Sequence, residues 1–453
     1  MNASFFGELL QTIAERGRAL IDRTRDRRGA EERSQSLIDL CEELLSGRGE
    51  ASGVAIAREI LARYEELTTG PRIAFFEALA HRFGTDHERI SAAVAAWQRN
   101  PSEDTAADLR AAAEPRRQEL FRRLNLAPGG TAALVGMREQ LIDALVRRED
   151  LAVVDADFVH LFSSWFNRGF LVLRHIDWST PAIVLEKIIR YEAVHEIRDW
   201  EDLRARIDPP DRRCYAFFHP ALVDEPLIFV EVALTEDLPE AIAPILAAER
   251  EPLPLKRAAT ATFYSISNCQ RGLSGVSFGH FLIKQVVEEI SREMPRLSTF
   301  VTLSPVPGFA RWLAGERAKE QSAALPAEDR VKLAALDVPR WWEQTGAEEV
   351  RDPLLRAAAS YFLGARTKRG VPLDPVARFH LGNGARLEQL NWLGDTSEKG
   401  LSQSHGLMVN YLYDLEEIEK NHEAYAEGRT IVASASIRRL ARHSALHLLP
   451  VPS

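Results

Sequence analysis

The segment that decides the fold is Phe263-Tyr-Ser-Ile-Ser-Asn-Cys-Gln-Arg-Gly-Leu-Ser-Gly-Val-Ser-Phe-Gly-His-Phe-Leu-Ile-Lys284. Its start belongs to the stretch Ala259 to Ser267, which alternates with a period of two and therefore predicts a strand. A loop with three glycines follows, and a helix is expected from about Val276 to Glu293, with apolar residues on one face. The glycines are Gly272, Gly275 and Gly279.

The residues of this glycine loop do not decide by themselves whether it binds a ligand. Glycines let the backbone approach a ligand closely, and the N–H groups of a helix's first turn bind phosphate well. However, no Gly-Lys-Ser/Thr follows, so the loop is not a Walker loop, and its spacing is not Gly-x-Gly-x-x-Gly. The segment fits either a phosphate-binding loop or a simple tight turn.

A second informative segment, Ser304-Pro-Val-Pro-Gly-Phe309, follows the short predicted strand Phe300 to Leu303. Proline has no backbone N–H, so the strand cannot continue its ladder through Pro305 and Pro307. Two parallel neighbours should then part at their carboxyl ends, where ligands bind in open α/β sheets, and Ser304 would lie at the rim of that crevice. The alternative is a strand-terminating turn in which Ser304 bonds only to the backbone.

A third segment places His380 before Gly382-Asn-Gly384, a turn sequence, and before a predicted strand from Ala385 to Trp392. A single histidine is more often structural than catalytic. We therefore expect a role in chemistry only if His380 meets Ser304.

Outward from these segments the chain divides into two halves. From Phe5 to about Arg168 apolar residues recur every three or four positions, which predicts a helical bundle, with Ser102 as one N-cap. Beyond residue 170 a strand is expected at Phe170–Arg174 and a hairpin at Cys214–Phe218 and Pro226–Leu234. The predicted fold class is α+β, with a helical domain over 1–169 and a mixed α/β domain over 170–453.

Composition removes several classes of protein. The 453 residues are 45% hydrophobic and carry a net charge of −9, which argues against disorder. Arginines alternate with acidic residues, so no basic stripe for nucleic acid is present, and no apolar run is long enough for a membrane span. Three distant cysteines predict neither a disulfide framework nor a zinc–cysteine site, and a cytoplasmic location is expected.

Together the motifs resemble the malonyl-CoA decarboxylase family. The resemblance rests on Phe-Tyr-Ser-Ile-Ser, on Gly-Leu-x-Gly-Val-x-x-Gly-x-Phe-Leu-Ile-Lys, on Leu-Ser-Pro-x-Pro-Gly-Phe, and on Phe-His-Leu-x-Asn-Gly-Ala followed by Asn-Trp. It implies an amino-terminal helical domain, a catalytic domain of GNAT-like fold with splayed parallel strands, and homo-oligomers. A dimer or a dimer of dimers is the default for such an assembly, and we expect a homotetramer held together by the helical domain.

The resemblance also implies site residues. Ser304 and His380 would be catalytic and bind substrate, and the loop from Ser274 to His280 would bind the CoA part of malonyl-CoA. The loop residues are Ser274, Gly275, Val276, Ser277, Phe278, Gly279 and His280. Some family members carry Glu where Ser277 stands, so no role of that carboxylate is transferred to this chain.

The implied chemistry requires no added cofactor. Loss of CO2 from a malonyl thioester leaves an enolate whose charge spreads into the thioester carbonyl, and the sequence offers no recognisable metal, biotin or pyridoxal site. Backbone N–H groups around Ile266 to Cys269 are candidates for the enolate oxygen. His380 would supply the proton, directly or through Ser304, and acetyl-CoA would be the product. The alternatives are an acyl-CoA N-acyltransferase on the same fold and a non-catalytic CoA-binding interaction protein.

Overall fold

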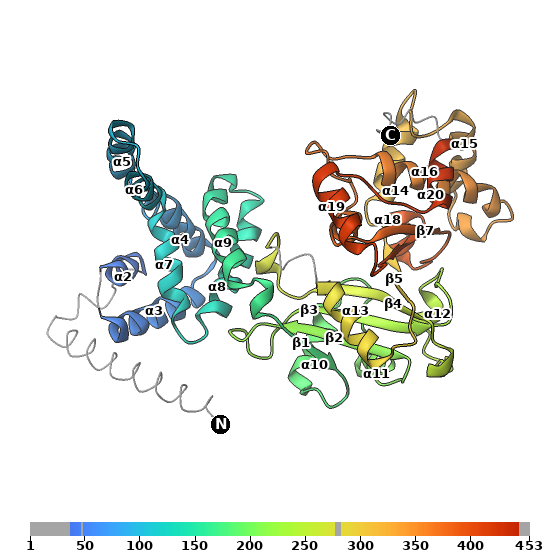
Figure 1. The fold of residues 1–453 in the computed structure, drawn as a ribbon, viewed down its shortest axis with the longest axis horizontal. Coiled ribbons are helices and arrows are strands. Elements are labelled where there is room, and N and C mark those ends of the chain that lie inside the picture. Colours follow the sequence, from blue (N-terminus) through green and yellow to red (C-terminus); the bar gives the residue numbers. More distant parts are fainter. Residues whose placement is uncertain (1–36, 47–48, 277–281, 444–453) are drawn as a thin grey trace. The chain divides into compact units, whose positions relative to one another are not determined.

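The computed structural model describes residues 37–46, 49–276 and 282–443 (Figure 1). It divides the chain into two compact units. The first holds the residues up to Leu171 together with His219–Val223 and the loop 270–276. The second holds 172–218, 224–269 and the residues from 282 onward. A helical region therefore precedes a mixed sheet region, and the predicted α+β class is confirmed.

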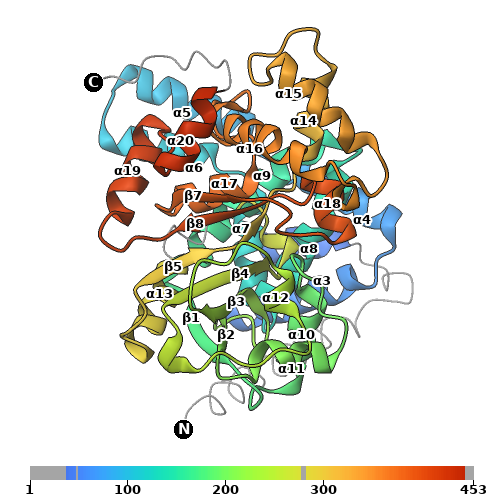
Figure 2. The same ribbon diagram turned by 90° about the vertical axis from the view of Figure 1, so that its right-hand side faces the viewer.

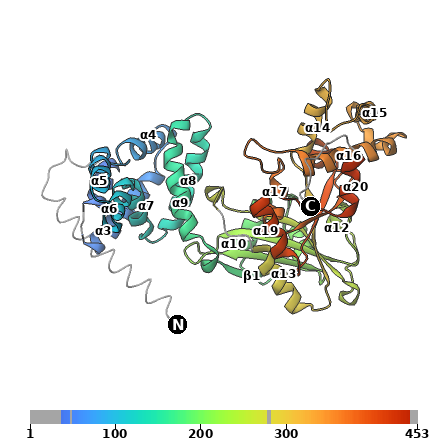
Figure 3. The same cartoon turned by 45° about the horizontal axis from the view of Figure 1, so that its top comes forward.

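The first unit is built from helices joined by short turns, because each helix has one apolar stripe to bury. Ser102 caps its helix as predicted, through a capping box with Thr105. Figure 3 shows α8 and α9 side by side in this unit, and Phe121 of α7 stacks on Phe158 of α9 with ring centroids 4.1 Å apart. The helices are α2 (Leu37–Leu45), α3 (Glu50–Glu65), α4 (Thr69–His81), α5 (His87–Arg99), α6 (Glu103–Ala113), α7 (Arg116–Asn125), α8 (Gly130–Leu145) and α9 (Ala152–Trp165).

The second unit is organised around one eight-stranded sheet of order β1-β2-β3-β4-β5-β8-β6, with β7 paired to β8. Figure 2 shows β3, β4 and β5 side by side, and β7 beside β8. The predicted hairpin is β2 with β3, and both strands are buried because one face is covered by α10 and α11. The strands are β1 (Val172–Ile176), β2 (Arg212–Phe218), β3 (Pro226–Thr235), β4 (Thr260–Asn268), β5 (Thr299–Thr302), β6 (Ser304–Pro305), β7 (Arg386–Asn391) and β8 (Met408–Leu412).

One helix of this unit, α13 (Leu282–Glu293), lies in the crossover between the parallel strands β4 and β5. The helix after β4 is described from Leu282 onward. Its start was predicted near Val276, and residues 277–281, between that point and Leu282, lie outside the described part. The helices are α10 (Ala182–Tyr191), α11 (Trp200–Ile207), α12 (Ala243–Leu246), α13 (Leu282–Glu293), α14 (Phe309–Ala318), α15 (Ala327–Lys332), α16 (Ala347–Gly364), α17 (Pro375–Gly382), α18 (Glu398–Ser404), α19 (Ile418–Gly428) and α20 (Ala435–His443). None of the helices in the described ranges is long and apolar enough to cross a membrane.

The two parallel strands part as predicted. β4 and β5 pair from Thr260 with Thr299 to Phe263 with Thr302, and one more backbone bond joins Leu303 to Phe263. β4 then continues along β3 as far as Asn268, whereas the segment after β5 becomes β6 and pairs with β8. The strands separate after Leu303, close to Pro305, which has no N–H to give to β4 but still pairs with Met408 of β8. This is the splayed arrangement of parallel strands that the sequence predicted.

Candidate active site

Ser304 and His380 meet in the structure. Ser304 Oγ lies 3.3 Å from His380 Nε2, and the two residues come from β6 and from the last turn of α17. Both are buried, with 5% and 3% of their surfaces exposed. Ser304 therefore lies inside the domain rather than at the rim of a crevice, and the condition set for a role of His380 is met.

The pair is oriented by a line of hydrogen bonds. Ser304 donates its hydroxyl hydrogen to Thr302 Oγ1 at 2.9 Å, so it accepts from His380 Nε2. His380 Nδ1 then accepts from the Tyr413 hydroxyl, 2.8 Å away. These directions assign the proton of the neutral imidazole to Nε2. The ring also stacks on Tyr411, with centroids 4.5 Å apart.

Burial determines the charge of this site. It lowers the pKa of His380 to about 3, so the imidazole is neutral at physiological pH. Burial also raises the pKa of Tyr413 well above its usual value, so its hydroxyl keeps its proton. The site therefore consists of neutral hydrogen-bonding groups arranged in a fixed order.

The helix that carries His380 is held at its start by Asp374. The carboxylate accepts the Ala377 N–H at 2.7 Å, and Pro375 occupies the first helical position, where its missing N–H costs nothing. Burial raises the pKa of Asp374 to about 6, and the Tyr361 hydroxyl reaches the same carboxylate at 3.4 Å. A hollow of about 350 Å³ opens beside Tyr361, with Pro307, Gly308 and Trp312 among its walls.

The described part of the glycine loop belongs to the helical unit. A Cβ on Gly272 would lie 2.0 Å from the Val135 carbonyl oxygen of α8, so only glycine fits there, and buried Arg138 donates to the Gly272 carbonyl at 2.7 Å. Gly275 has a φ of +77°, which glycine adopts without strain.

Of the loop residues expected to bind CoA, Ser274 and Gly275 are exposed and Val276 is buried. The others, Ser277, Phe278, Gly279 and His280, lie outside the described residues.

One expectation about the enolate oxygen needs correction. The backbone N–H groups around Ile266 to Cys269 were expected to face a ligand, but the Cys269 N–H donates to the Leu227 carbonyl at 2.9 Å. The reason is that β4 remains paired with β3 after it has left β5. Cys269 therefore cannot contribute to an oxyanion site.

Sequence reasoning missed Thr302, Tyr411 and Tyr413. The last two lie in Met408-Val-Asn-Tyr-Leu-Tyr413, an alternating run rich in branched and aromatic residues that is typical of a strand. The Asp374-Pro375 pair is likewise a helix-start signal, which would have placed His380 on a helix. Which of these residues reach His380 depends on pairing across the sheet, and that is not visible in one sequence.

Comparisons with known proteins point to one family. Residues 169–448 match the malonyl-CoA decarboxylase C-terminal domain, and residues 83–166 match the malonyl-CoA decarboxylase N-terminal domain. The mitochondrial malonyl-CoA decarboxylase of the goose Anser anser anser is 37% identical over 417 residues, which is 84% of this chain and 82% of that protein. The rat protein is 37% identical over 395 residues, 80% of each chain.

Solved structures are similar over most of the chain. The crystal structure of malonyl-CoA decarboxylase from Rhodopseudomonas palustris is 61% identical and superposes with a TM-score of 0.86, covering 89% of this chain and 98% of that one. The enzyme from Agrobacterium vitis is 56% identical, with a TM-score of 0.85 and coverage of 89% and 99%. By both its sequence and its fold, the chain belongs to the malonyl-CoA decarboxylase family.

Proposed function

We propose that this chain converts malonyl-CoA to acetyl-CoA and CO2 without a metal or an organic cofactor. The observation that carries the proposal is the buried Ser304–His380 pair, 3.3 Å apart where two parallel strands separate. Among the described residues, no group of three or more His, Cys, Asp or Glu side chains is placed to hold a metal ion. The family membership of the chain supports the choice of substrate.

The reaction has two steps. The electron pair of the bond between the carboxylate and the adjacent carbon moves into the thioester carbonyl, which releases CO2 and leaves an enolate. That carbon then takes one proton, so malonyl-CoA and one proton become acetyl-CoA and CO2. Because the thioester itself accepts the electrons, the protein has to orient the substrate, stabilise the enolate oxygen and deliver the proton.

The residues of the site suit proton delivery through a relay. Ser304 turns its O–H from Thr302 to the enolate carbon and takes the Nε2 proton of His380, while His380 takes the proton of Tyr413 at Nδ1. The Tyr413 anion is short-lived because burial keeps the pKa of Tyr413 high, and a proton from solvent restores the hydroxyl. The imidazole thus never becomes a full cation, which agrees with its low pKa of about 3. A thioester enolate is a strong enough base to draw a proton from this line of neutral groups.

The direct test incubates the purified protein with malonyl-CoA alone and follows acetyl-CoA and CO2. We expect both products in equal amounts, without added metal, amine or cofactor. Products that form only when an amine is added would favour the acyltransferase alternative, and tight CoA binding without turnover would favour the interaction protein. Ser304→Ala and His380→Asn should each lower kcat far more than they raise KM, and an unchanged kcat would remove that residue from the mechanism.

We also propose that the loop from Ser274 to His280 binds the CoA phosphates through backbone N–H groups, which would explain how a chain with a net charge of −9 takes an anionic substrate. We propose further that the helical unit mediates self-association into a homotetramer in the cytoplasm, because its helix α5 has no buried residue and so offers exposed surface for contact. Light scattering on the full chain should give about four times 50.8 kDa, and a monomer mass would contradict the assembly.

A further inference from the structure

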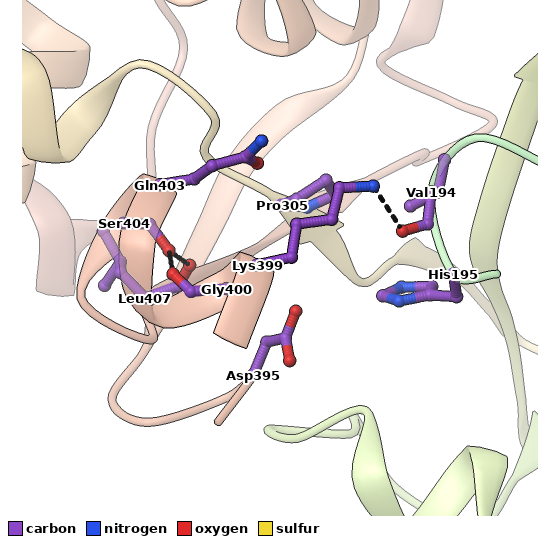
Figure 4. Close-up of a pocket in the computed structure, with 9 residues that line it drawn as sticks. All are labelled: Val194, His195, Pro305, Asp395, Lys399, Gly400, Gln403, Ser404 and Leu407. Atoms are coloured by element: carbon purple, nitrogen blue, oxygen red, sulfur yellow. Dashed lines mark hydrogen bonds between the residues drawn. The ribbon is translucent and has the colours of Figure 1, made fainter. Parts of the chain in front are cut away.

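A second cavity, with several polar side chains in its walls, lies in the mixed unit beside Pro305 of β6 (Figure 4). Its walls come from the loop between α10 and α11, from Pro305, and from the connection between β7 and β8. The cavity is narrow, with room for about one water-sized group. The residues that line it are Val194, His195, Pro305, Asp395, Lys399, Gly400, Gln403, Ser404 and Leu407.

His195 is the unusual member of this cavity. Its Nε2 is buried and has no hydrogen-bond partner in the described part of the chain, while 9% of the residue is exposed. Figure 4 shows its ring pointing toward Asp395 and the stem of Lys399. A buried ring nitrogen without a partner costs stability, so its retention calls for a ligand.

The loop that presents His195 is locked by charged side chains. Glu192 accepts the Val194 and His195 N–H groups at 2.8 and 2.7 Å. Lys399 Nζ donates to the Ala193 and Val194 carbonyls at 2.6 and 3.0 Å. Side chains therefore fix both the N–H and the carbonyl groups around His195.

The same loop is tied to the parted strand. Ser265 and Ser267 of β4 donate to the Glu192 carboxylate, at 2.8 and 3.1 Å. Arg206 holds the His195 carbonyl at 2.8 Å. The two serines of the Phe-Tyr-Ser-Ile-Ser motif thus place His195 beside the gap that β4 and β6 leave. Such rigid support is typical of a residue that must meet a ligand in one geometry.

The geometry points to His195 as the residue that binds the free carboxylate of malonyl-CoA, through Nε2, with Lys399 beside it. This inference rests on the proposed function. Ser304 and Pro305 are successive strand residues, so their side chains lie on opposite faces of β6. A malonyl group between the parted strands would have the proton relay on one face and His195 on the other.

That placement fits the stereoelectronic demand of the reaction. The bond to the carboxylate must stand perpendicular to the thioester plane for its electrons to enter the carbonyl, and a carboxylate held from the His195 face meets this condition. The proton would then arrive from the opposite face.

Asp395 moderates the charge of the subsite. Its carboxylate accepts the Ser397 N–H at 2.9 Å and lines the same cavity as Lys399, so the substrate carboxylate would meet a negative as well as a positive group. Tight binding of the ground-state charge would oppose its loss as CO2. Burial lowers the pKa of His195 to about 4, so the ring is neutral and one of its nitrogens carries a hydrogen to donate.

The test compares ligands with and without the carboxylate on the full chain. In His195→Leu, KM for malonyl-CoA should rise about 10- to 100-fold, the usual effect of losing a hydrogen bond to a charged group. The competitive Ki of acetyl-CoA, which lacks the carboxylate, should stay within about twofold. His195→Gln keeps an N–H near the Nε2 position and should recover part of the loss. His175→Leu on β1 is the control and should change neither constant, because that exposed ring contacts Asp177 and Tyr215 and does not line the cavity.

Several results would overturn the inference. Equal loss of malonyl-CoA and acetyl-CoA binding would make His195 a structural residue. A fall in kcat alone, with a larger solvent deuterium isotope effect, would make it a proton donor. If the wild-type chain released no CO2, the proposed function would be wrong. The carboxylate subsite could still be tested, by comparing the calorimetric affinities of malonyl-CoA, its methyl ester and acetyl-CoA. The wild type should prefer malonyl-CoA to the ester, and an equal affinity for the two would refute the subsite even if the variants did not fold.

Discussion

Replacing Tyr413 with phenylalanine tests the proton relay most directly. The substitution removes the hydroxyl that lies 2.8 Å from His380 Nδ1 and leaves a buried nitrogen without a donor. Lost hydrogen bonding and an unsatisfied buried group together amount to roughly 1–3 kcal/mol, which is about a 5- to 150-fold fall in kcat if the bond tightens in the transition state. KM for malonyl-CoA should change little, because Tyr413 is not expected to touch the bound CoA.

The assay is the initial rate of acetyl-CoA formation against malonyl-CoA concentration, in H2O and in D2O. Loss of the relay should make proton transfer slower and raise the solvent isotope effect on kcat. Tyr64→Phe is the matched control, since that buried hydroxyl donates to Gln140 at 2.7 Å in the helical unit. A Tyr413→Phe enzyme with wild-type kcat, or an equal loss in Tyr64→Phe, would refute the relay.

Three other predictions concern stability and the support of the site. Because burial lowers the pKa of His380 to about 3, the unfolded chain binds one more proton between about pH 3 and 6.5, so stability falls as pH falls through that range. Between pH 7.5 and 5 the free energy of unfolding of the His380→Gln variant, measured by urea titration, should fall by about 2 kcal/mol less than that of the wild type. Parallel curves of unfolding free energy against pH would contradict a neutral His380 ring. Asp374→Ala should lower the free energy of unfolding by about 1 kcal/mol and should also lower kcat. Asp374→Asn keeps the helix cap and should restore kcat. If it did not, the cap would not be what positions His380. Gly272→Ala should destabilise the chain by about 1–3 kcal/mol in thermal or urea unfolding, since its Cβ would meet the Val135 carbonyl, and a neutral effect would disprove the close packing.

The course of the central strands was predictable because single residues determine it. The two prolines of Ser304-Pro-Val-Pro-Gly-Phe309 have no N–H to give to β4, and β4 and β5 separate just before them, although Pro305 still pairs with β8. The alternation of 259–267 likewise marked β4 to within one residue at each end. Local rules of this kind act within a few residues and can be applied to one sequence.

The remainder of the site could not be predicted because it depends on long-range pairing. Tyr413 reaches His380 only because β8 pairs with β5 and β6, and nothing in the sequence near either residue specifies that register. His195 is more remote still, since its position follows from Glu192 binding two serines more than 70 residues away. In addition, the apolar surroundings that lower the pKa of His380 come from several elements at once.

The contact of Gly272 with α8 has a consequence for dividing this protein into parts. The glycine loop lies between β4 and α13 in the chain, yet its described residues fold with the helical unit, where Arg138 and the backbone at Val135 hold it. A fragment that began after α9 would keep the full length of this loop and lose the surface that shapes it. The helical unit therefore supports a loop that comes later in the chain. A chimera that takes the helical unit from a relative should also take residues 270–276 from that relative.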